Sequence, residues 1–229
     1  MRNLKKIFLI ILFLVFLVGI VYYFLIKNTF DEKGSTERMK NTASEEVSIY
    51  KMNKNPAKEQ TISNDSSKNI VATLNESGIY EVSTIKMKDT SQASTDTIIP
   101  PLDGTFTGVF ISKDQSLDIP ANSVVKFSPV KFDLLGSTGD FTLNKMGSYY
   151  VGNQLAPGSY QVAYSSSKDP SLEDRTNVQV IITLDGEIKQ SIELNQANQS
   201  SEILLKKGML VSIKSNEFHF QLIFEKKEE

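Results

Sequence analysis

The stretch Asn177-Val-Gln-Val-Ile-Ile-Thr-Leu184, followed by Asp185-Gly186 and then by Glu187–Leu194, decides the fold class of this chain. Apolar and polar side chains alternate on both sides of the Asp-Gly pair, and a period of two is typical of a strand with one buried face. Asp-Gly also supplies the positive φ angles that the central residues of a type I′ turn require. The stretch therefore predicts a β-hairpin.

Similar strand signals occur along much of the chain. Pro157-Gly158 fits the central positions of a type II turn between Tyr149–Gln154 and Ser159–Tyr164. Residues 218–224 alternate apolar and polar side chains in a last expected strand. No window beyond residue 29 has a convincing helical period. We therefore expect an all-β fold.

Three matches in the same order along the chain indicate an internal repeat. The matched pairs are Leu74–Val82 with Leu155–Val162, Leu102–Phe110 with Leu184–Ile192, and Ile119–Phe127 with Leu205–Ile213. Ordered matches at slowly growing spacing predict two copies of one structural unit. We expect duplicated β-sandwich-like units over residues 69–136 and 146–226. Each is close to the lower size limit for an independent core, so the sequence leaves open whether they form one domain or two.

The N-terminus carries a long apolar run. Ile7–Ile26 contains no charge, Pro, Asn or Gln, and as a helix it reaches the ~30 Å thickness of the hydrocarbon layer. No A-x-A-like cleavage site follows the run, so we expect an uncleaved signal-anchor helix over residues 1–29, with a cleaved signal peptide as the alternative. The positive-inside count places the N-terminus in the cytoplasm by a small margin. The prediction is a single-pass plasma-membrane protein whose C-terminal region is extracytoplasmic.

Composition restricts the linker and the partners. Residues 30–68 are rich in Lys, Glu, Ser, Thr and Asn, which predicts a flexible stalk, and we assign no element to the apolar patch Val47–Tyr50 within it. The chain has no Cys and a single His, which excludes disulfides and zinc sites built from Cys and His. All 27 acidic residues lie beyond residue 29, whereas four of the 25 basic ones precede it. The acidic β region therefore argues against a nucleic-acid partner.

The segment Tyr149-Tyr-Val-Gly-Asn-Gln-Leu-Ala-Pro-Gly-Ser-Tyr160-Gln-Val162 resembles a module of Gram-positive surface proteins with the pattern Y-x-V-G-x-D-[IL]-x-A-G-x-Y-x-[VL]. Leu205–Ile213 is similar to a later L-x-x-G-x-x-[VL]-x-I segment of that module. Gln154 stands where the family often has Asp, which leaves a shared ligand open. The resemblance implies a surface-exposed β domain on a membrane anchor or lipoprotein, and it implies no particular activity.

The residues with chemical potential are few. His219 lies on the polar face of the last expected strand, where no second His or Cys could pair with it, and the loop carboxylates form no EF-hand string. We therefore expect no enzyme activity, catalytic residue, metal or cofactor. Most tyrosines near the Pro-Gly turn fit core positions, but an aromatic platform for a sugar ring or a partner side chain is the alternative. Tyr150 and Tyr164 are its candidate binding residues.

The expected function is that of a membrane-anchored binding module. It would contact membrane lipid through Ile7–Ile26 and a protein partner through the loops of the β units. A cell-wall glycan is the alternative ligand, and an extracytoplasmic hydrolase would need two acids that converge in one cleft.

Overall fold

The computed structural model describes residues 45–88, 98–165, 177–195, 199–216 and 220–228. The predicted anchor Ile7–Ile26 and His219 lie outside these residues. Within the described part, no helix is both long and apolar enough to cross a membrane. The fold is mostly β, as the sequence predicts, with a short helix over residues 45–52.

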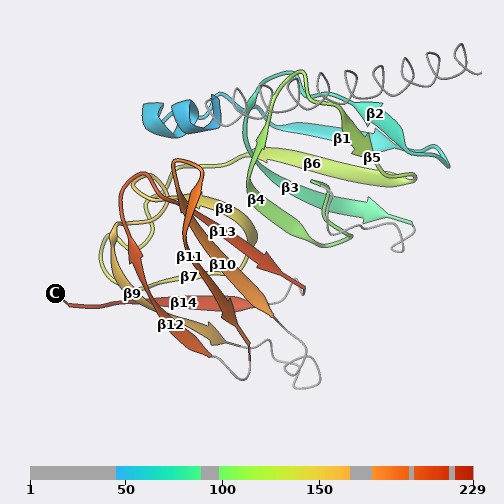
Figure 1. Cartoon of the computed structure of the whole chain (residues 1–229). Coiled ribbons are helices and arrows are strands. Elements are labelled where there is room, and N and C mark those ends of the chain that lie inside the picture. Colours follow the sequence, from blue (N-terminus) through green and yellow to red (C-terminus); the bar gives the residue numbers. More distant parts are fainter. Residues whose placement is uncertain (1–44, 89–97, 166–176, 196–198, 217–219, 229) are drawn as a thin grey trace, which may run out of the picture. The chain divides into compact units, whose positions relative to one another are not determined.

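The strands follow one another along the chain in two groups (Figure 1). The first six are β1 (Gln60–Asn64), β2 (Ile70–Ala72), β3 (Gly78–Met87), β4 (Thr105–Ile111), β5 (Leu117–Ile119) and β6 (Ser123–Pro129). The remaining described strands are β7 (Phe141–Leu143), β8 (Met146–Tyr150), β9 (Gly158–Ser165), β10 (Val178–Leu184), β11 (Glu187–Leu194), β12 (Ser200–Leu205), β13 (Leu210–Ser215) and β14 (Gln221–Lys226). We refer to residues 60–129 as the first β unit and to residues 141–226 as the second.

The two β units have the same connectivity. The order β1-β6-β3-β4 of the first unit recurs as β7-β14-β9-β12 in the second, and the pair β2-β5 recurs as β8-β13. Each of these pairings is antiparallel, and the chain passes through equivalent strands in the same sequence. The hairpin β10-β11 has no counterpart among the described strands of the first unit. It adds two strands beside β13.

This hairpin explains why two of the three sequence matches join non-equivalent strands. The match of Leu74–Val82 with Leu155–Val162 aligns the beginning of β3 with the beginning of its equivalent strand β9. The second match aligns β4 with β11 instead of β12, and the third aligns β5 and β6 with β12 and β13 instead of β13 and β14. Each is displaced by one strand, because the inserted hairpin has the same alternating pattern as the strands that follow it.

Each core contains the same pair of aromatic rings. Tyr80 of β3 meets Phe127 of β6 edge to face, with ring centroids 6.3 Å apart and planes at 89°. Tyr160 of β9 meets Phe224 of β14 at 6.2 Å and 74°. Both tyrosine hydroxyls donate to the carbonyl four residues earlier, at 2.7 Å for Tyr80 and 3.1 Å for Tyr160. The rings are buried while the hydroxyls stay hydrogen-bonded, which keeps both tyrosines compatible with an apolar core.

One parallel strand pair joins the two units. β4 pairs with β8 through Phe106–Met146 and Thr107–Gly147, so a single eight-stranded sheet runs through both units. Glycine permits this close approach. A Cβ on Gly108 would lie 1.7 Å from the Ser148 carbonyl oxygen, and a Cβ on Gly147 would lie 1.8 Å from the Thr107 carbonyl oxygen.

The structure corrects the predicted linker and unit boundaries. The residues expected to form a flexible linker, 30–68, include the helix over 45–52 and strand β1, which pairs with β6 along its whole length. The sequence of β1 resembles that of a linker because Ile62 is its single apolar residue. The strand is held in place by the pairing of its backbone with β6. The second unit likewise begins at β7, before the expected boundary at residue 146.

Candidate functional site

A cleft lies where the two β units meet. It has a volume of about 420 Å³, within the roughly 300–1,000 Å³ typical of ligand pockets. We name it the junction cleft. The first unit and the loop after it contribute Glu81, Val130, Lys131 and Asp133, and the second contributes Lys145, Tyr149 and Gln154.

The junction cleft carries charges of both signs. Lys145, between β7 and β8, places its Nζ 2.6 Å from Oε2 of Glu81 on β3, so this ion pair links the two units. Both side chains are more than one-third exposed, and solvent therefore weakens the pair to about 0–1 kcal/mol. Lys131 and Asp133 add one further charge of each sign. The lining thus favours neither an anion nor a cation by net charge.

Gln154 is the most deeply buried polar side chain of the cleft. Only 4% of its surface is exposed. Its Oε1 accepts a hydrogen bond of 2.9 Å from the Tyr150 amide, and its backbone carbonyl accepts one of 2.8 Å from the Leu135 amide. Within the described part of the chain its Nε2 donates to no residue. This Nε2 is not closed off from solvent, unlike the buried Tyr164 hydroxyl, so it can donate a hydrogen bond to a group bound in the cleft.

Tyr149 forms part of the wall rather than a stacking surface. It is 7% exposed, and its hydroxyl donates to the Lys145 carbonyl at 3.0 Å. Burial, and secondarily the Glu81 carboxylate, raises the pKa of this hydroxyl, so Tyr149 stays neutral across the physiological range. Val130 is a further apolar residue of the lining.

The two tyrosines predicted as a binding platform do not meet. Tyr150 is 7% exposed and stacks on Tyr50, with centroids 4.6 Å apart and planes at 6°, so it is a core residue. Tyr164 is partly buried against the core of the second unit. Its hydroxyl is buried with no hydrogen-bond partner among the described residues. The two rings belong to different clusters and form no common surface.

The sequence alone gives little indication that these residues line a common cleft. Glu81 and Lys145 are distant along the chain and neighbours only through the fold. Gln154 was notable for replacing the Asp of the resembled pattern. Asp185 has a positive φ angle of 52°, in agreement with the turn role predicted for it, and Asp103 adopts a similar φ angle of 60°.

The described residues contain no group of three or more His, Asp or Glu side chains that could hold a metal ion. Three loop carboxylates, Asp169, Glu173 and Asp174, lie outside those residues.

Comparison with known proteins gives no match, neither to a protein-family model nor to a curated protein.

Proposed function

We propose that this chain is a binding module, anchored in the plasma membrane by Ile7–Ile26, whose duplicated β units hold a segment of an extracytoplasmic protein partner in the junction cleft. The observation that carries the proposal is the buried Gln154 amide, which lines the cleft and has a donor without a partner in the described part of the chain. The resemblance to a module of Gram-positive surface proteins agrees with this placement.

A peptide segment suits the chemistry of the lining. Its backbone carbonyls can accept from Gln154, and its side chains can pair with both charges of the Glu81–Lys145 pair. Leu135, which also lines the cleft and is 39% exposed, offers apolar contact. The mixed character matches a protein ligand better than a uniformly charged one.

A cell-wall glycan remains the second candidate, favoured by hydroxyl and amide side chains of the lining such as Thr107, Ser128 and Asn144. Sugar rings commonly stack on exposed aromatic rings, however. Tyr149, the aromatic residue of the lining, is 7% exposed and its hydroxyl is engaged. We therefore place the protein partner first.

The test is photo-crosslinking on intact cells that produce the full chain. A photoreactive phenylalanine derivative replaces Lys131 in the cleft, or Lys189 on exposed β11 as the matched control. We expect one defined adduct from position 131 and none of that mass from position 189. Gln154→Glu keeps the oxygen that accepts from Tyr150 and removes the donor, so it should abolish the adduct.

The same adduct from both positions, or no adduct at all, would overturn the protein-partner proposal. Retention on purified wall polysaccharide that depends on Gln154 would favour the glycan. Orientation is tested separately with a C-terminal tag, which external protease should remove from intact cells.

A further inference from the structure

Residues 48–57 run from the short helix into β1 and contact both β units; we name them the clamp. Ile49 and Tyr50 are 2% and 1% exposed and lie in a third apolar cluster. The other buried members of this cluster are Ile79 and Val130 of the first unit and its following loop, and Tyr150 of the second.

The clamp attaches to the second unit through Tyr50. The Tyr50 ring stacks on Tyr150 at 4.6 Å and also contacts Phe132 at 5.3 Å. Asn153 donates from Nδ2 to the Tyr50 carbonyl and to Oδ1 of Asn53, both at 2.7 Å. A stacked ring and a hydrogen-bonded backbone together fix the position of this part of the clamp.

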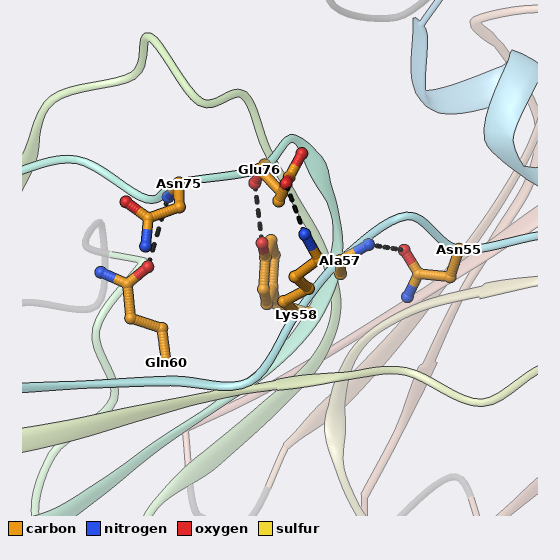
Figure 2. A network of polar contacts seen from close by, with 7 residues as sticks. Asn55, Ala57, Lys58, Gln60, Asn75 and Glu76 are labelled. Carbon is orange, nitrogen blue, oxygen red and sulfur yellow. Dashed lines mark hydrogen bonds and ion pairs between the residues drawn. The ribbon is translucent and has the colours of Figure 1, made fainter.

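The clamp attaches to the first unit through Asn55. Its Nδ2 donates to the Ile79 carbonyl at 2.6 Å and to the Val130 carbonyl at 3.0 Å. Its Oδ1 accepts from the Ile79 amide at 3.0 Å and from the Ala57 amide at 3.2 Å, the second of these contacts being visible in Figure 2. One side chain thus makes four contacts with backbone groups.

Both attachments lie directly behind the junction cleft. Val130 accepts from Asn55 and also lines the cleft. Tyr150 stacks on Tyr50, and its amide donates to Gln154 of the cleft. The direct strand pairing between the units is only two residue pairs long, so it constrains their relative position much less than a full ladder would.

We propose that the clamp holds the two β units at the spacing that forms the junction cleft, with the β4–β8 pair as the hinge. Release of Tyr50 from Tyr150 then widens the cleft and separates Gln154 from the groups that line the first unit. The inference rests on the proposed function in taking the cleft as the binding site.

The absence of native cysteine allows a direct test in the full chain, purified in detergent micelles. Lys131→Cys and Asn144→Cys place spin labels on two exposed lining residues, one in the loop after the first unit and one in the second unit. We expect one narrow distance distribution by pulsed electron paramagnetic resonance. Tyr50→Ala should broaden it and shift it to longer distance.

Two matched variants act as controls. Tyr50→Phe preserves the stacked ring, and Met52→Ala changes a residue of the same helix that is 63% exposed. Both should retain the parental distribution. A parental distribution in Tyr50→Ala, with its β-type circular dichroism intact, would overturn the clamp.

If Tyr50→Ala does not fold, Asn153→Asp decides the question, because it removes the donor to Tyr50 without opening the core. Broadening with Asn153→Asp supports the clamp, and an unchanged distribution rejects it. No partner is present in this measurement. Its failure is therefore distinguishable from failure of the photo-crosslinking experiment.

Discussion

The two β units share one connectivity, but the equivalent strands β5 and β13 are stabilised by different neighbours. In the second unit, β10 extends the sheet beside β13 and buries Val178, Val180 and Ile182 almost completely. In the first unit the equivalent strand, β5, has no such neighbour among the described strands. Asn64 at the end of β1 instead donates to the carbonyls of Ile119 and Pro120, at 3.1 and 2.9 Å. One unit therefore has the larger apolar core, and the other depends more on polar contacts and on its attachment to its neighbour.

The largest expected effect comes from removing the equivalent core rings. Phe224→Ala and Phe127→Ala each delete a fully buried phenylalanine, which costs about 3–5 kcal/mol. Chemical unfolding followed by circular dichroism measures the loss. Hydrogen exchange should show Phe127→Ala exposing amides of the first unit ahead of the second, because the second core does not contain that ring. Equal exposure of both units would show that they unfold as one.

The next largest effect is expected at the β4–β8 pair, which joins the two units. Gly147→Ala places a Cβ 1.8 Å from the Thr107 carbonyl oxygen at a φ of 125°. Since backbone strain alone costs about 1–3 kcal/mol, we expect the free energy of unfolding to fall by at least that amount. Gly186→Ala is the matched control: its φ is 82°, and a Cβ there meets nothing within 4 Å. Only Gly147→Ala should raise exchange at the β4–β8 pair. Equal behaviour of the two variants would contradict the role of close approach.

The local features of this fold could be predicted from the sequence. Asp185 and Gly186 do form the turn of β10–β11, with φ angles of 52° and 82°, because turn chemistry and alternation act over a few residues. The junction cleft could not be predicted, since Glu81 and Lys145 meet only through pairing that depends on Gly108 and Gly147. Tyr150 is a core residue, as the favoured prediction for these tyrosines has it, but strand parity could not reveal that Tyr50, in an expected linker, covers its ring.

A smaller effect is expected when the hydrogen bonds from Asn64 to the end of β5 are removed in the first unit. Asn64 is 2% exposed and also accepts from Ser66 through its Oδ1. Asn64→Ala leaves buried carbonyls without their donor, which costs about 1–3 kcal/mol. The exposed Ser66→Ala loses the bonds of one hydroxyl and should change the free energy of unfolding by less than about 1 kcal/mol. If both variants match the parental chain in urea unfolding, Asn64 does not stabilise β5.

The smallest expected effect concerns the ion pair that links the units. Glu81 and Lys145 are both partly exposed, so a double-mutant cycle with Glu81→Gln and Lys145→Met should give a coupling of about 0–1 kcal/mol. That coupling should weaken in high salt, because solvent-exposed charges are screened. Partner capture from position 131 should nevertheless fall in Lys145→Met, since the proposed ligand would use this charge. A coupling above about 3 kcal/mol would instead identify the pair as a structural link between the two units, comparable to a buried salt bridge. The difference between a weak effect on folding and a strong effect on capture is what a binding role at the cleft requires.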